Sequence, residues 1–153
     1  MDEKRYEKLE KKGTPIEEIN LIRALDDAAS LNSVAFRTYP NGRIFNLSLN
    51  DCGIDYIPEE INILERLEYL FIHEPKIKKI PDSIGDLRNL KKMRIYQSSI
   101  DHLPESLIKL TKLDLLSVTK SKLSKFPSIL CVMTSLKTLN LSHNSIKAIP
   151  ECI

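Results

Sequence analysis

Apolar residues return at a fixed interval through most of this chain, from Ile44 to Ile153. The interval is 23 residues, and it can be read from one set of positions: Ile44, Leu67, Leu90, Leu113 and Leu136. A proline follows each of these residues at a constant distance, at Pro58, Pro81, Pro104, Pro127 and Pro150. Self-similarity at a period of roughly 20–50 residues is the sequence signature of a repeat architecture. We therefore expect residues 44–153 to form five stacked units, the last of them incomplete.

Each unit begins with a short stretch in which apolar and polar residues alternate. The apolar pairs are Leu47/Leu49, Leu70/Ile72, Met93/Ile95, Leu116/Val118 and Leu139/Leu141. A period of two indicates a strand with one buried face, and stacking of the units places these strands side by side. The pattern predicts a curved parallel sheet, with the polar positions on its exposed, concave face.

A second group of apolar residues should turn into the same core before each proline. It comprises Ile54, Ile77, Ile100, Leu123 and Ile146, and the residues directly before the prolines, Ile57, Ile80, Leu103, Phe126 and Ile149. Proline has a fixed φ and no backbone donor, so it ends a strand and suits the first turn of a helix. Short helices or turns are therefore expected on the convex face.

The first 43 residues lack the repeat and predict a cap for its first unit. A charged helix is expected over residues 2–12, ended by Gly13. A capping box, Thr14-Pro15-Ile16-Glu17, then opens an amphipathic helix that runs to about Ala29. The apolar stripe of this helix consists of Ile16, Ile19, Ile22 and Leu25.

Two strand-like stretches, VAFRTY and RIFNLSL, flank Pro40-Asn41-Gly42. They predict a hairpin with Gly42 in the left-handed conformation, and the second arm of that hairpin is the strand of the first repeat. We interpret residues 1–153 as a single domain. Residues 1–43 form its N-terminal helical and hairpin cap, and residues 44–153 form the five repeats.

The segment Ile80-Pro-Asp-Ser-Ile-Gly-Asp-Leu-Arg-Asn-Leu resembles the 23-residue intracellular leucine-rich repeats of Ras-suppressor and scribble-type proteins, and those of prokaryotic stand-alone repeat proteins. The resemblance implies an α/β leucine-rich-repeat solenoid that acts as a binding scaffold and has no catalytic activity. One feature departs from the family. Its ninth position, where the family's asparagine bridges neighbouring coils, holds Cys52, Pro75, Ser98, Ser121 and Asn144. Pro75 has no side-chain donor and should distort the turn after Ile72.

Composition narrows the function classes. A net charge of +2 lacks the strongly basic footprint of nucleic-acid binding. No apolar run approaches a membrane span, and the opening MDEKRYEKLEKK is unlike a secretory signal, so we expect a cytoplasmic protein. The cysteines, Cys52, Cys131 and Cys152, are expected to be unpaired, as in a reducing compartment.

The histidines and cysteines do not predict a metal site or a catalytic centre. His73 and His143 share the concave face but lie three coils apart, roughly 14 Å at a strand spacing of about 4.8 Å. No base, nucleophile and orienting group converge in the pattern. We expect no enzymatic activity, no metal and no cofactor.

The concave positions of the second and third units carry the clearest sign of binding. Tyr69, Phe71, Arg94 and Tyr96 fall on adjacent exposed strands, and aromatic and arginine side chains dominate interface energetics. We predict a partner-binding site centred on these four residues. Its margin is formed by His73 and Leu115. The alternative is that Tyr69 and Phe71 only fill a tightly curved surface or touch a neighbouring molecule.

Charge offers a second candidate surface along the ascending edge of the coils. The basic side chains there are Lys76, Lys78, Lys79, Lys122, Lys125 and Lys147. They could meet an acidic partner or anionic lipid, or they could simply be solvated.

The last coil suggests a different function. We expect one side of Leu136, Leu139, Leu141, Ile146 and Ile149 to be open to water. The alternative to a protein-binding scaffold is therefore a self-assembling unit, a homodimer that pairs through its C-terminal coil.

Overall fold

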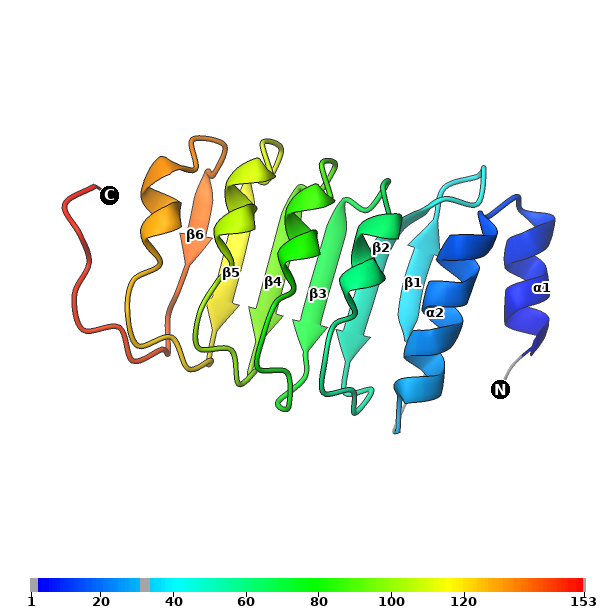
Figure 1. Ribbon diagram of the computed structural model, residues 1–153, viewed down its shortest axis with the longest axis horizontal. Helices are drawn as coiled ribbons and strands as arrows, with labels where there is room; N and C mark the ends of the chain where they lie inside the picture. Colours follow the sequence, from blue (N-terminus) through cyan, green and yellow to red (C-terminus); the bar gives the residue numbers. More distant parts are fainter. Residues whose placement is uncertain (1–2, 31–33, 153) are drawn as a thin grey trace.

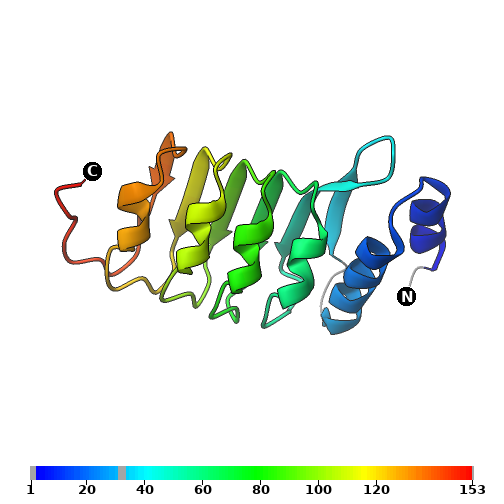
Figure 2. The same cartoon turned by 45° about the horizontal axis from the view of Figure 1, so that its top comes forward.

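The computed structural model describes residues 3–30 and 34–152 of the chain. It is an elongated solenoid with strands on one face and short helices on the other (Figure 1, Figure 2). Two α-helices come first, α1 (Glu3–Lys11) and α2 (Ile16–Ala28). The strands are β1 (Ala35–Thr38), β2 (Ile44–Asn50), β3 (Tyr69–His73), β4 (Lys92–Tyr96), β5 (Leu115–Thr119) and β6 (Thr138–Asn140). Between them lie four 3-10 helices: η1 (Glu59–Ile63), η2 (Asp82–Asp86), η3 (Glu105–Lys109) and η4 (Ser128–Val132).

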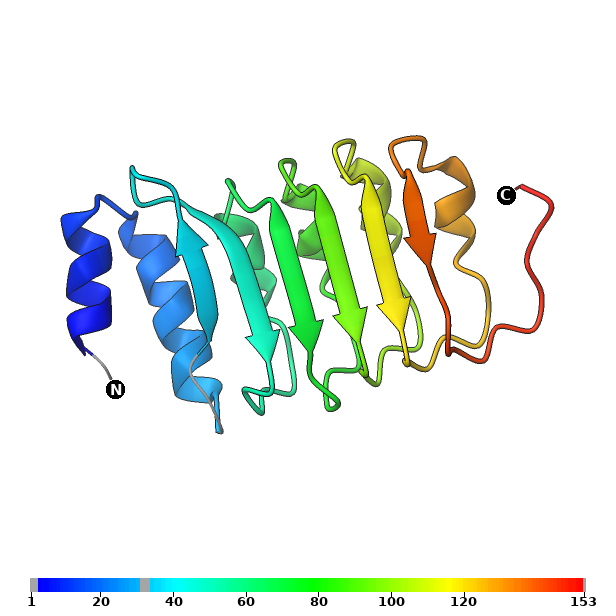
Figure 3. The same cartoon turned by 180° about the vertical axis from the view of Figure 1, so that it is seen from behind.

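All the strands form one sheet in sequence order, which Figure 3 shows from its exposed side. β1 runs antiparallel to β2, and every later neighbour is parallel. The register repeats with the sequence period, so equivalent residues stand side by side. One such row is Leu47, Leu70, Met93, Leu116 and Leu139. The predicted α/β solenoid with a parallel sheet is confirmed.

The inward-facing repeat residues form one continuous core. Ile54, Ile77, Ile100 and Leu123 are at most 2% exposed, and Ile57, Ile80 and Leu103 are at most 7% exposed. The last coil is different. Ile146 is only partly buried, and Ile149, which we predicted to point inward, is 72% exposed. The reason is that the described residues contain no further coil to cover it.

Each 3-10 helix begins at the residue after a repeat proline. Pro58, Pro81, Pro104 and Pro127 hold φ values between −67° and −72°, at the position before the first helical residue. Because proline pre-sets φ and needs no donor there, it fixes the point where the chain turns onto the convex face. Adjacent helices approach closely at Gly85, where an added Cβ would lie 2.4 Å from the Ser106 carbonyl oxygen.

The turns after the strands show why the second coil is unusual. Asp51, Gln97, Lys120 and His143 occupy equivalent positions and all have φ near +50°. Glu74 holds the same position in the second coil, but it is not among the described residues with positive φ, in keeping with the distortion predicted at Pro75. Glu74 is 1% exposed.

The buried Glu74 carboxylate performs the bridging role that Pro75 cannot. It accepts hydrogen bonds from the backbone N–H groups of Cys52 and Gly53 in the preceding coil. In the last coil, Asn144 Oδ1 accepts the N–H of Leu123 in the same way, at 3.2 Å. Glu74 thus accepts two backbone donors of the preceding coil, one of them buried and the other partly buried.

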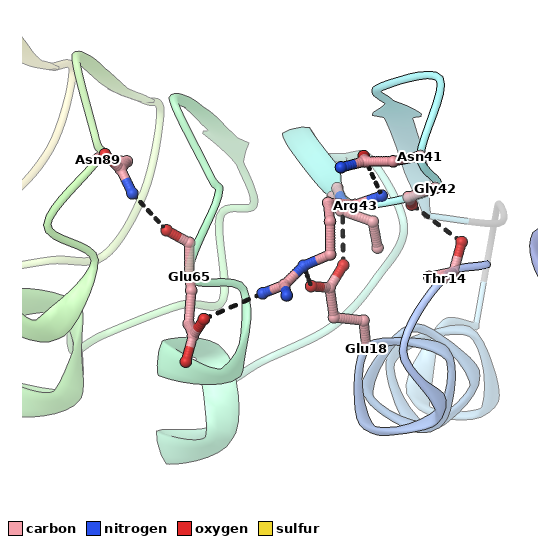
Figure 4. Close-up of polar contacts among 8 residues, drawn as sticks. Thr14, Glu18, Asn41, Gly42, Arg43, Glu65 and Asn89 are labelled. Atoms are coloured by element: carbon pink, nitrogen blue, oxygen red, sulfur yellow. Dashed lines mark hydrogen bonds and ion pairs between the residues drawn. The ribbon is translucent and has the colours of Figure 1, made fainter. Parts of the chain in front are cut away.

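Helix α2 packs against the first coil through a rotated version of its predicted face. Ile19, Ile22 and Leu25 are buried, but Ile16 is 53% exposed and Leu21 is buried in its place. The predicted capping box is wrong. Pro15 is the N-cap residue, no side chain caps the helix, and the Thr14 hydroxyl donates to the Gly42 carbonyl at 2.9 Å instead (Figure 4).

The rotation of α2 brings a carboxylate into the core. Glu18 is fully buried, and its Oε2 accepts the Ile44 N–H at 2.9 Å. Its Oε1 lies 2.6 Å from Arg43 Nε, and Arg43 reaches exposed Glu65 at 3.1 Å. Burial raises the pKa of Glu18, and the Ile44 N–H and Arg43 oppose that shift. A charged network therefore joins the helix, the hairpin and the first repeat.

The hairpin and the first helix match their predictions. β1 and β2 pair antiparallel, and Gly42 has φ +84°. The start predicted for the first helix, Asp2, lies outside the described residues, as does Ile153 at the other end. Tyr6 of α1 is 2% exposed and donates to Asp26 Oδ2 at 2.7 Å. The pKa of Tyr6 is raised to about 12, mainly by burial and secondly by the contact with Asp26.

One prediction about the cysteines is wrong. Cys131 on η4 and Cys152 in the last turn form a disulfide, while Cys52 is a buried thiol. The pairing brings together residues 21 positions apart, because η4 and the last turn lie on the same side of the coil stack. The expectation of a reducing compartment relied on three unpaired thiols, and it loses that support.

Candidate partner-binding face

The exposed face of the sheet carries the side chains that point away from the core. Strand alternation places Tyr69 and Phe71 of β3 beside Lys92 and Arg94 of β4, in register. Leu115 of β5 follows Lys92 in the same row. All six predicted site residues lie on this face or at its edge, and all are exposed or half-buried.

A first contact joins the centre of this patch. The Arg94 guanidinium lies over the Phe71 ring, 5.8 Å from its centroid. Lys92 Nζ lies at the same distance over Tyr69. An aromatic face attracts a cation within about 6 Å, so these pairs hold two positive charges above apolar rings.

A second contact forms at the end of the strands. The rings of His73 and Tyr96 meet edge to face, with centroids 5.0 Å apart. His73 Nδ1 also lies 3.6 Å from Asp51 Oδ2. Lys120 then donates from Nζ to the Tyr96 hydroxyl at 2.7 Å and sits 5.0 Å from the ring centroid. Tyr96 remains 39% exposed, so part of its ring is open to a partner.

The sequence interpretation missed an aromatic extension toward the hairpin. Phe45 contacts Tyr69 edge to face at 6.3 Å and Tyr39 at 4.8 Å. The Tyr39 hydroxyl donates to Glu68 at 2.7 Å, and this hydrogen bond raises the pKa of Tyr39. Partial burial acts to raise the pKa of Glu68, but hydrogen bonds from Lys91 and Tyr39 outweigh it, and the pKa is lowered. Strand alternation assigns Phe45 to the inward positions with Leu47 and Leu49, so the sequence pattern did not indicate this contact, and only the hairpin register brings Tyr39 to it.

The basic edge is a weaker candidate surface. Its six lysines are exposed, but they do not form an uninterrupted positive strip. Lys78 and Lys79 line a groove that also contains Asp55, Asp82 and Glu105. The mixture of signs reduces the local potential that an acidic partner or lipid would experience.

The described residues show no arrangement suited to metal binding. No group of three or more His, Cys, Asp or Glu side chains among them could hold a metal ion. His102 pairs with its neighbour Asp101 at 2.5 Å on an exposed loop, far along the chain from His73 and His143. Among the helices of residues 3–30 and 34–152, none has the length and apolar character needed to cross a membrane.

The stacked 23-residue coils match a known repeat family. A family model described as a leucine-rich repeat region matches residues 25–152. The chain belongs to the leucine-rich repeat family. Proteins of this family are typically non-catalytic modules that mediate protein–protein interaction.

Solved leucine-rich repeat structures share this fold. A leucine-rich repeat protein from Leptospira interrogans is 30% identical, with a TM-score of 0.65, over 69% of this chain and 27% of that chain. The BIR3–SERK2 complex from Arabidopsis thaliana matches at 23% identity and TM-score 0.66, over 81% and 69%. A plant ice-binding protein matches at 26% identity and TM-score 0.64, over 84% and 46%. No curated protein matches the chain.

Proposed function

We propose that this leucine-rich repeat chain is a protein-interaction module that binds its partner through the exposed face of the sheet. The site is centred on Tyr69, Phe71, Arg94 and Tyr96. His73 and Leu115 form its margin. The observation that carries the proposal is the row of cation–aromatic pairs across β3, β4 and the turn after β5.

These pairs have the properties of interface hot spots. Aromatic rings bury a large area at low entropic cost, and arginine adds directional hydrogen bonding. The rings are held by their neighbours in the free protein, so little ordering is needed on binding. Lys92, Arg94 and Lys120 make the patch positive, and we infer that the partner presents acidic side chains together with an apolar anchor.

The test uses the chain as bait, followed by affinity measurement with each captured partner. Phe71→Ala and Tyr96→Ala should each weaken binding by roughly 2 kcal/mol or more, about 30-fold, because a buried aromatic anchor is lost. The matched control is Lys125→Ala with Lys147→Ala, on exposed lysines away from the patch. A partner that survives the aromatic variants and is lost with the lysine variants would place the site on the basic edge instead.

A second candidate function, self-association through the C-terminal coil, is favoured by one observation. A groove of about 440 Å³ opens there, lined by Phe126, Leu139, Leu141, Ile146, Ile149 and neighbouring polar residues. β6 is also the terminal strand of the described sheet, so a second copy could pair with its open edge. Sedimentation velocity over a wide concentration range should then show a dimer that Ile149→Asp abolishes. A monomer at all concentrations would eliminate this candidate.

A further inference from the structure

Another groove lies on the face of the molecule opposite the exposed face of the sheet, where α2 runs beside η1 (Figure 1). Its volume is about 670 Å³. The apolar residues that line this Tyr56 groove are Leu21, Ala24, Tyr56, Ile57, Pro58 and Ile63. Leu21 and Ile57 are firmly packed, at 5% and 6% exposure, so the floor is part of the core rather than a mobile loop.

Tyr56 stands out among these residues. It is 55% exposed, more than Tyr96 of the sheet face, and its hydroxyl makes no hydrogen bond to any described residue. It borders both the Tyr56 groove and the neighbouring groove of about 770 Å³ along the coil edge. A large aromatic side chain with a polar tip in this position suits an interface.

The charge of the Tyr56 groove is uniform in sign. Its rim carries Glu17, Glu59 and Glu60, and no lysine or arginine lines it. All three glutamates are exposed, and none forms an ion pair with a basic side chain within residues 3–30 and 34–152. The sheet face has the opposite character, since Lys92, Arg94 and Lys120 lie over its rings. The two surfaces therefore select partners of opposite charge.

We propose that the Tyr56 groove binds a cationic amphipathic helix of a protein partner. The apolar face of such a helix would cover Leu21, Ile57 and Ile63, in the helix-in-groove mode. Its lysines or arginines would meet Glu17, Glu59 and Glu60, and the Tyr56 ring would accept one of these cations on its face. This inference does not depend on the function proposed for the sheet face. Together they describe a chain that can hold an acidic and a basic partner at once.

The test is a titration with a labelled helical peptide of leucine and lysine, about 18 residues or five helical turns long. An equivalent leucine–glutamate peptide measures non-specific apolar binding. Tyr56→Ala and the pair Glu59→Gln/Glu60→Gln should each weaken binding of the basic peptide at least ~10-fold, through loss of the aromatic anchor and of the two charges. Amide resonances of Leu21 and Ala24 should shift on titration.

Two control variants match the changes in chemistry. Tyr96→Ala removes an exposed tyrosine from the other face, and Glu7→Gln/Glu10→Gln removes two exposed charges from α1. Both should bind the basic peptide as the unchanged chain does. The proposal is overturned by three results: no binding of the basic peptide up to about 1 mM, undiminished binding to a correctly folded Tyr56→Ala, or equal loss in both glutamate pairs. Loss of the sheet-face partner would leave this result unaffected, so the two proposals fail separately.

Discussion

Replacing Glu18 tests how the N-terminal helices are joined to the repeats. The Glu18 carboxylate is buried and accepts the N–H of Ile44, the first residue of β2. Glu18→Ala removes this acceptor and leaves a buried donor without a partner, which costs about 1–3 kcal/mol. Loss of the buried γ-methylene group adds roughly 1 kcal/mol. We expect the free energy of unfolding to fall by about 2–4 kcal/mol in total.

The charge of Glu18 should matter less than its oxygen atoms. Burial raises the pKa of Glu18, which means that ionisation opposes folding even beside Arg43. The contribution of Glu18 to the free energy of unfolding is therefore complete below the pKa that it has in the unfolded chain. This contribution is lost as pH rises through the higher pKa of the folded protein. Glu18→Gln keeps an oxygen acceptor for Ile44 and removes the charge. It should be within about 0.5 kcal/mol of the unchanged chain, or slightly more stable, at neutral pH.

Urea unfolding followed by circular dichroism measures all of these free energies at one fixed pH. The matched control is Glu17→Ala, on the exposed neighbouring residue, which should change stability by less than about 0.5 kcal/mol. The reasoning is refuted if Glu18→Ala is as stable as Glu17→Ala. If Glu18→Gln is as damaging as Glu18→Ala, the ion pair with Arg43 is the main contribution and the hydrogen bond is not.

Three further predictions concern other parts of the fold. The pKa of Tyr6 is about 12 in the folded protein, against an ordinary value of 10.0, so its contribution to the free energy of unfolding is complete below pH 10. This contribution should fall by about 2–3 kcal/mol as pH rises to 12. Urea unfolding at pH 9 and pH 11.5 should show the loss in the unchanged chain and not in Tyr6→Phe. Gly85→Ala should destabilise the protein by about 1–3 kcal/mol because its Cβ would meet backbone of η3, whereas Asn62→Ala at the equivalent place in η1 should be tolerated in the same assay. Thiol titration of the denatured, unreduced protein should count one thiol, and Cys131→Ser should lower stability by about 2–4 kcal/mol, an effect absent from a comparison under reducing conditions; three titrated thiols would contradict the disulfide.

The repeat region was predictable because each element obeys a local pattern. The alternation around Leu70 and Ile72 indicated the strand, and Pro81 indicated the point where η2 starts. Regular stacking then determined the register, so the repeat pattern alone placed Tyr69, Phe71 and Arg94 on one face. The use of that face as a binding site stays a prediction.

The N-terminal and C-terminal parts were predicted less well because their structure depends on contacts between distant residues. A glutamate is normally assigned to the polar face of an amphipathic helix, and only the buried N–H of Ile44 makes Glu18 a core residue. The hydroxyl of Thr14 donates to the carbonyl of Gly42 and leaves its own helix uncapped. The pairing of Cys131 with Cys152 likewise follows from the way the last coil returns to η4.

The Glu74 bridge has a consequence for protein engineering. Repeat proteins are often engineered as chains of interchangeable units, in which one coil is replaced by cutting at two equivalent leucines. Here the carboxylate of the second coil completes the backbone of the first, at Cys52 and Gly53. A chimaera that keeps the first coil and replaces the second with a consensus unit must therefore also supply an acceptor for those two N–H groups. A graft should therefore begin after the second coil, and the first two coils should be kept together as one unit.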